Sequence, residues 1–169
     1  KMPYTYPRNQ AELTNYDYRV SEEIDKMEGV YDYDAVISVQ WPFGYGQSYT
    51  TFGYDKFKCS KVNFNAADEL TFSVDVSNTG KVTGKEVVML FSRDMVASLT
   101  PENRRLRAFK KIELRPGETQ TVVLTIKASD LAFVGTDGKW ILEQGDFRMQ
   151  AGNQAVNVKC EKTYKWTTP

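Results

Sequence analysis

Carboxylates are the side chains of this sequence that could take part in acid–base chemistry. Four of them lie close together near the N-terminus: Glu22, Glu23, Asp25 and Glu28. Hydrolysis of a glycosidic bond uses two carboxyl groups, one as the acid and one as the nucleophile or base, with pKa values held apart. Nothing near this cluster would raise one pKa and leave another low, so we interpret it as the solvated face of a short helix. We therefore predict no catalytic residue in this chain.

Nucleophilic triads, metal sites and dinucleotide loops find no support in the sequence either. The chain has no histidine, which excludes Ser-His-Asp and Cys-His pairs and every metal site that contains histidine. Its two cysteines are too far apart in sequence to build a structural zinc site. Gly44-Tyr45-Gly46 lacks the third glycine and the βαβ context of a dinucleotide-binding loop. We expect no metal and no cofactor.

Aromatic side chains are the remaining candidates for binding. Trp41, Tyr45 and Tyr49 could stack on a sugar ring, which makes them candidate sugar contacts. The alternative is that these rings pack a junction between two structural units. We favour packing, because glycines lie between the rings.

The stretch that positions these rings is residues 41–54, which we interpret as a hinge. Pro42 holds Trp41 in an extended conformation, while Gly44 and Gly46 allow bends or close backbone contact. Four aromatic residues within nine positions are too many for a solvated linker, so we expect their rings to be buried on both sides. The predicted junction residues are Trp41, Pro42, Phe43, Gly44, Tyr45, Gly46 and Tyr49.

After the hinge, residues 55–169 show the period of two that is typical of strands with one wet face. Leu70, Phe72, Val74 and Val76 alternate with polar residues and should face a core. Residues 86–91 form an apolar run, which predicts a central strand covered on both faces. Turn residues recur every 8–10 positions near the C-terminus. This pattern predicts an all-β, immunoglobulin-like antiparallel sandwich of about seven strands.

Charge separates the chain into the same two parts. The 22 basic and 22 acidic residues cancel, so nucleic acid is not an expected partner. Residues 1–40, however, carry eight acidic and four basic groups, and we expect them to form an irregular N-terminal extension. No apolar run is long enough to span a membrane. Six cations between residues 104 and 115 alternate with apolar residues and predict a strand whose outward charges discourage edge pairing.

The two cysteines leave two alternatives open. Cys59 and Cys160 lie near the first and last predicted strands, which can be neighbours in a sandwich. A disulfide is one alternative. We favour two free thiols, because proteins whose fold depends on disulfides usually have more cysteines than two in a chain of this size.

Four motifs, in order along the chain, resemble those of glycoside hydrolase family 3. They are Pro42–Gly46 with Ser48–Phe52, Val76–Val88, Leu106–Ile112 and Leu114–Thr119. Met2–Arg8 and the turn from Glu143 to Phe147 also resemble family sequences. The family has an arginine after the tyrosine at the position of Tyr33, where this chain has Asp34.

The resemblance implies a fibronectin type III-like domain at residues 55–169, with residues 1–40 as the tail of an α/β sandwich domain. It implies that the catalytic aspartate and glutamate of a β-glucosidase or β-xylosidase lie upstream. Because Lys1 begins in the middle of a motif, we expect this sequence to be part of a longer polypeptide. The family also implies a periplasmic or secreted location.

Three functions follow as hypotheses. The first is a non-catalytic C-terminal module that braces the catalytic domains of the same polypeptide. The second is a carbohydrate-binding module, and the third is a free-standing adhesion or interaction domain.

Overall fold

The computed structural model describes residues 1–8 and 39–167. Among these residues, the one helical element is the 3₁₀ turn η2 (Ala128–Leu131). The seven long strands are β1 (Phe52–Cys59), β3 (Glu69–Asn78), β4 (Gly84–Asp94), β5 (Arg105–Leu114), β6 (Thr119–Lys127), β9 (Gly145–Ala151) and β10 (Gln154–Cys160). The short strands are β2 (Asn63–Phe64), β7 (Phe133–Val134), β8 (Trp140–Leu142) and β11 (Tyr164–Trp166).

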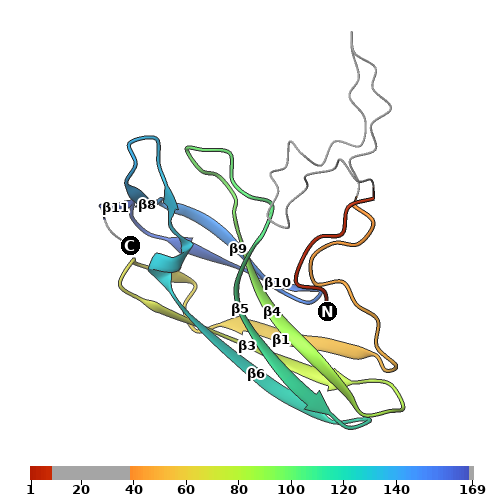
Figure 1. Ribbon diagram of the computed structural model, residues 1–169. Coiled ribbons are helices and arrows are strands. Elements are labelled where there is room, and N and C mark those ends of the chain that lie inside the picture. The colour runs from red at the N-terminus through yellow and green to blue at the C-terminus, as the bar shows by residue number, and fades with distance from the viewer. Residues whose placement is uncertain (9–38, 168–169) are drawn as a thin grey trace.

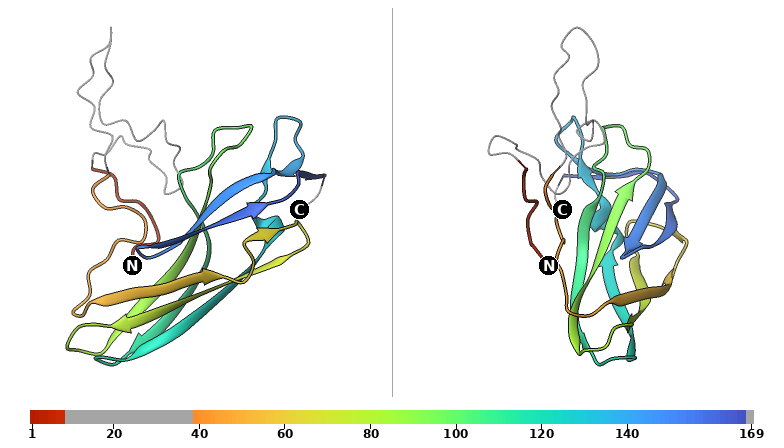
Figure 2. Two further views of the ribbon diagram at one scale, coloured as in Figure 1. Left: turned by 180° about the vertical axis from the view of Figure 1, so that it is seen from behind. Right: turned by 90° about the vertical axis from the view of Figure 1, so that its right-hand side faces the viewer.

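The long strands form the two layers of a sandwich (Figure 1). One sheet has the order β1-β3-β6, and the other has the order β2-β10-β9-β4-β5. Every pairing between two long strands is antiparallel, while the short β2 pairs with β10 in parallel. The two views of Figure 2 show these layers from behind and from the side. The predicted all-β sandwich is confirmed.

The core between the layers is built by the predicted alternation. Leu70, Phe72, Val74 and Val76 of β3 are all 2% exposed or less. On the neighbouring strand, Val122, Leu124 and Ile126 lie opposite three of them and are buried too. Burying one such side chain contributes about 1.5–3 kcal/mol, so this pairing fixes which face of the sheet turns inward.

The apolar strand β4 has the predicted central place, between β9 and β5, but its two faces differ. Val88 and Leu90 are fully buried in the core, whereas Val87 and Met89 on the outer face are half-buried. The expectation that both faces are covered is thus met only on the inner one. The outer face carries the residues that form the candidate site.

The basic residues of the 104–115 stretch lie largely on β5, the edge strand of the five-stranded sheet. Lys110 and Lys111 are exposed there, and charged side chains on an edge oppose pairing with another sheet. A register shift opposite Leu90 and Phe91 marks a bulge in this strand.

The third, small sheet has the order β11-β8-β7 and closes one end of the sandwich. Trp140 and Trp166 face each other across it and pack partly buried against the core. The thiols of Cys59 and Cys160 are free, as favoured from the sequence.

Several sequence predictions fall outside the described residues. The acidic cluster from Glu22 to Glu28 belongs to the stretch 9–38, and so does most of the predicted extension. In the part of the chain that the structure describes, no helix is long and apolar enough to cross a bilayer.

Candidate docking surface at the aromatic junction

The first residues of the chain pair with the beginning of the junction. The amide of Tyr6 donates to the carbonyl of Trp41 at 2.8 Å, and the amide of Met2 donates to the carbonyl of Tyr45 at 2.8 Å. The amide of Gly44 returns a hydrogen bond to the carbonyl of Met2 at 2.9 Å. Figure 2 shows the two segments side by side in both views. Their backbones therefore hold each other in a short ladder beside the sandwich.

A row of aromatic rings runs along this ladder. The ring centroids of Tyr4 and Tyr6 are 6.4 Å apart, and those of Tyr6 and Trp41 are 5.1 Å apart. Trp41 and Tyr45 stack at 6.0 Å with an interplanar angle of 15°. Contacts of this kind stabilise a fixed arrangement of rings beyond the area they bury.

The outer side of this row is open. Trp41 and Tyr45 are 37% and 39% exposed, and Tyr49 is 102% exposed. The expectation that the rings are buried on both sides is therefore wrong for the described residues, in which the five-stranded sheet covers only one side of the junction. An open apolar surface of this kind is typical of a contact with another protein or domain.

Phe43 and Gly44 fix the junction to the outer face of β4. The ring of Phe43 meets the ring of Phe91 edge-on at 6.3 Å. Gly44 has φ +81°, and a Cβ at this position would come within 2.6 Å of Cε of Met89. The left-handed backbone favours glycine here, and a larger residue would also have to displace the end of the Met89 side chain. Gly46, the second predicted junction glycine, leaves 3.1 Å between an added Cβ and Cα of Lys1.

A buried amide holds the C-terminal end of the junction. The hydroxyl of Thr50 donates to Oδ1 of Asn78 at 2.6 Å, and the amide of Gly80 donates to the same oxygen at 3.1 Å. Nδ2 of Asn78 donates to the carbonyls of Val82 and Leu114 at 2.8 and 2.9 Å. Asn78 belongs to the motif Val76–Val88, but the sequence pattern did not identify this tether.

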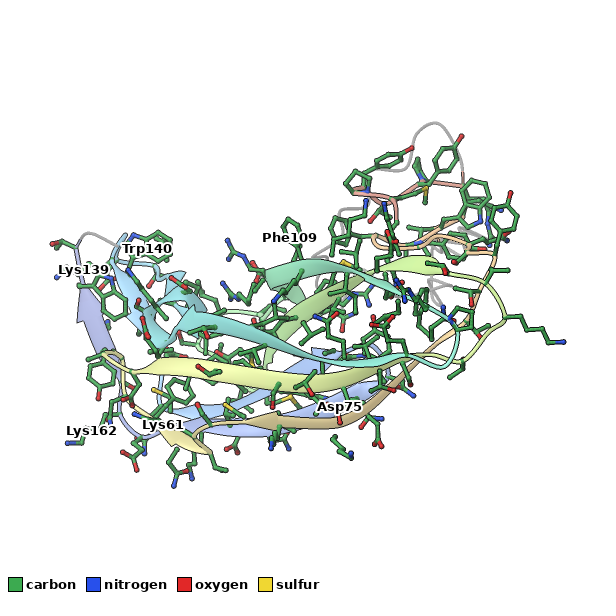
Figure 3. The ribbon with its side chains drawn as sticks, turned by 90° about the horizontal axis from the view of Figure 1, so that it is seen from below. Lys61, Asp75, Phe109, Lys139, Trp140 and Lys162 are labelled. Carbon is green, nitrogen blue, oxygen red and sulfur yellow. The ribbon has the colours of Figure 1, made fainter. Side chains whose placement is uncertain are left out.

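The outer face of the sheet also presents Phe109, which the sequence analysis did not single out. Phe109 is 67% exposed and lies directly opposite Met89 in the β4–β5 register. In Figure 3 its ring points away from the sandwich. Strand alternation could have indicated this orientation. Phe109 lies three positions from the inward-facing Ile112, and residues an odd number of positions apart point to opposite faces of a strand. We call the rings of Trp41, Tyr45, Tyr49 and Phe109 the docking surface.

Glu86 of β4 is a buried charge that joins the two sheets near this surface. It is 6% exposed, accepts a hydrogen bond from the hydroxyl of Tyr54 at 2.7 Å and lies 2.7 Å from Nζ of Lys1. Burial, followed by the hydrogen bond to Glu86, raises the pKa of Tyr54 far above its usual value. The carboxylate and the phenol therefore stabilise a contact between β1 and β4.

Among the described carboxyl groups, Asp94 is the most perturbed upward. It lines a pocket of about 260 Å³ together with Trp140 and Phe147. Burial raises the pKa of Asp94 to about 6, and the charge of Glu143 adds to this effect. Glu143 itself accepts a hydrogen bond from the amide of Ser98 at 2.8 Å. One carboxyl of this kind can hold a proton, but glycosidic hydrolysis needs a second group in a defined position.

The comparisons with known proteins extend these observations. Residues 86–155 match the family model described as a fibronectin type III-like domain. The chain is 33% identical to the lysosomal β-glucosidase of Dictyostelium discoideum over 94% of its own length and 19% of the relative. It is 36% identical to a β-xylosidase of Formosa agariphila over 90% of its length and 21% of the relative.

Solved structures agree with the sequence relatives. A β-glucosidase structure from Erythrobacter marinus is 31% identical, with a TM-score of 0.80, over 92% of this chain and 21% of that one. A β-glucosidase from Listeria innocua, at 23% identity and a TM-score of 0.80 over 93% of this chain and 23% of that one, shares the fold. The chain thus spans about a fifth of the length of these relatives.

Proposed function

We propose that this chain is a non-catalytic module of a family 3 β-glucosidase or β-xylosidase. Residues 86–155 match the fibronectin type III-like model, and relatives named β-glucosidase and β-xylosidase match nearly the whole chain. Its task is to brace the catalytic domains of the same polypeptide. The hydrolysis of β-glycosides belongs to residues outside this chain. The division into a tail (1–40), a hinge (41–54) and a sandwich (55–169) is part of this proposal.

The observation that carries the proposal is the docking surface. The exposed rings of Trp41 and Tyr45 belong to a backbone ladder that holds them in place, and exposed Phe109 lies opposite Met89, whose Cε is next to Gly44. Clustered, pre-ordered aromatic residues are typical of the centre of a protein interface. A position beside the hinge suits a contact between domains of one polypeptide.

The experiment begins with the coding sequence upstream of Lys1, which should encode a barrel with an aspartate nucleophile. The upstream domains and this chain are then produced separately and mixed, and their association is measured by titration calorimetry. We expect saturable binding, which Tyr45→Ser or Phe109→Ser weakens about ten-fold or more. Val123→Ser is the matched control, since Val123 is 47% exposed on the other sheet.

Two outcomes would contradict this function. A coding sequence that begins at or near Lys1, with no hydrolase before it, would favour a free-standing interaction domain. Hydrolysis of chromogenic β-glucosides by the purified chain would contradict the assignment of catalysis to upstream residues. We expect no such activity above that of a buffer control.

Carbohydrate binding is the second candidate, and the near-parallel stack of Trp41 on Tyr45 favours it. A flat, exposed aromatic face can lie against the apolar face of a pyranose ring. Titration with glucose, xylose and short oligosaccharides separates the two functions. Saturable binding that Trp41→Ala abolishes supports a sugar site. An absence of binding at millimolar sugar supports the bracing function alone.

A further inference from the structure

Two arginines lie directly opposite each other on the outer face of the five-stranded sheet. Arg93 of β4 and Arg148 of β9 are partners in the antiparallel register. Residues paired in this way have Cβ atoms about 4.5–5.5 Å apart, and like charges in such a pair destabilise a sheet. The two guanidinium groups therefore repel each other, and the alternation of apolar and polar residues along the two strands does not explain why both positions are arginine.

A third arginine approaches the same place. The guanidinium of Arg104 lies over the ring of Phe91, 5.0 Å from its centroid. Together with Arg93 and Arg148 it lines a pocket of about 410 Å³, to which Asn103 and Gln150 add amide groups. No carboxylate of the described residues lines this pocket. Its local charge is therefore strongly positive in a chain whose net charge is zero.

None of these three arginines forms an ion pair within residues 1–8 and 39–167. Arg93 donates to Oδ1 of Asn103 at 3.2 Å, which leaves its charge uncompensated. Ion pairs elsewhere in the same ranges, such as Lys85 with Glu113 at 3.1 Å, neutralise exposed cations on the same sheet. In the part of the chain that the structure describes, the pocket is thus a place where positive charge accumulates without a counter-charge.

We propose that this pocket binds a carboxylate side chain of the upstream domain that docks at the aromatic junction. Guanidinium groups bind carboxylates through paired, charge-assisted hydrogen bonds, and one anion between Arg93 and Arg148 would turn their repulsion into attraction. Pro42 of the junction lines the pocket, which places it beside the docking surface. The inference rests on the proposed bracing function and adds an acidic partner to it.

The test uses Arg148→Gln, which removes one charge and keeps a polar side chain of similar length. Arg148 is exposed, so the variant should fold. For the isolated chain, we expect a higher melting temperature, because the repulsion with Arg93 disappears. For association with the separately produced upstream domains, we expect a dissociation constant about ten-fold larger, equivalent to about 1.4 kcal/mol.

Lys159→Gln is the matched control. Lys159 is exposed on β10, its partner in the register is Asp146, and it does not line the pocket. This variant removes one positive charge from the same sheet. Its dissociation constant should stay within about two-fold of that of the unsubstituted chain, as expected for a single charge on an exposed surface.

The outcomes separate the inference from the function on which it rests. If the original chain does not associate with the upstream domains, the bracing function is wrong. If it associates and Arg148→Gln has no larger effect than Lys159→Gln, the arginine pocket is not part of the contact.

A second arm identifies the source of the carboxylate. The isolated chain is titrated with acetate and with glucuronate, and the amide NMR signals of Arg93 and Arg148 are followed. Weak, equal binding of both anions supports a side-chain carboxylate. Glucuronate that binds more than ten-fold more tightly than acetate would overturn the proposal in favour of an acidic sugar.

Discussion

Asn78 shows how one buried side chain can hold three segments of the chain together. It is 1% exposed, and its amide joins Thr50 of the junction, the turn at Gly80 and Val82, and the end of β5 at Leu114. Its amide oxygen and both amide hydrogens are used, and the hydrogen bonds with Thr50 and Leu114 are buried. Buried polar groups that lose such a partner are costly.

Asn78→Ala should therefore lower the free energy of unfolding by about 2–4 kcal/mol, because it leaves the buried carbonyl of Leu114, the part-buried carbonyl of Val82 and the hydroxyl of Thr50 without this partner. Chemical denaturation followed by tryptophan fluorescence measures this change. Asn157→Ala, at an exposed position of β10, is the control and should change stability by about 0.5 kcal/mol or less. Equal effects of the two substitutions would contradict the role of Asn78 as a tether.

Asp94 makes the stability of the protein depend on pH. Its folded-state pKa of about 6 lies above the ordinary value of 3.8, so the folded chain binds this proton more tightly than the unfolded chain does. The contribution to stability is fully present below the ordinary value and is lost as the pH rises through the folded value. Asp94→Asn keeps an acceptor for the amide of Val96 and removes the charge.

We expect the melting temperature of Asp94→Asn, relative to the original chain, to rise between about pH 4 and pH 7. Asp137→Asn is a control of opposite sign, since the hydrogen bond from the Lys139 amide lowers the pKa of Asp137. That variant should lose stability relative to the original chain as the pH rises from acid values. A difference for Asp94→Asn that does not change with pH would show that burial does not perturb this carboxyl.

At the scale of elements, the junction depends on one backbone conformation. Gly44→Val should detach the junction from β4, because valine opposes the left-handed φ and its side chain would displace the end of the Met89 side chain. Hydrogen exchange at the amides of Met2, Tyr6 and Gly44 measures the ladder, and the amides of β3 measure the sandwich. We expect faster exchange in the ladder with little change in β3.

Gly138→Val is the control for a strained glycine substitution outside the junction. Gly138 has φ +72°, but an added Cβ there has no atom within 4 Å. This control should leave the ladder protected. If Gly44→Val accelerates exchange in β3 as much as in the ladder, the junction and the sandwich are a single cooperative unit.

The strands themselves could be predicted from the sequence, because β3 and β6 each bury every second residue against one core. The docking surface could be predicted only in part. The types and spacing of Trp41 and Tyr45 identified a junction, but not that their rings lie open. The opposition of Arg93 and Arg148 depends on a register between strands far apart in sequence, and no local pattern encodes it.

At the scale of the whole molecule, the core lies entirely within the sandwich. Among residues 1–8 and 39–167, the buried cluster extends from Phe57 to Cys160 and contains no residue before the strands begin. A chain of residues 48–169, which retains the Thr50–Asn78 tether, should therefore fold alone and unfold cooperatively. Its melting temperature should be somewhat lower, because Met89 and Phe91 lose their cover.

Circular dichroism and thermal unfolding of the shortened chain measure this prediction, with the full chain as the reference. Loss of the cooperative transition would show that the N-terminal ladder is needed for folding. A folded shortened chain that still associates with the upstream domains would place the contact on β5 and the arginine pocket rather than on the rings of Trp41 and Tyr45.

The hydrogen bond between Tyr54 and Glu86 also gives the molecule an internal optical reporter. Nine other tyrosines occur in the sequence, but the phenol of Tyr54 is held protonated between the two layers. In an alkaline absorbance titration, the phenolate band of this side chain should emerge only when the layers separate. The phenolate absorbance of Tyr54 would therefore report when the two sheets separate, without any added dye or label.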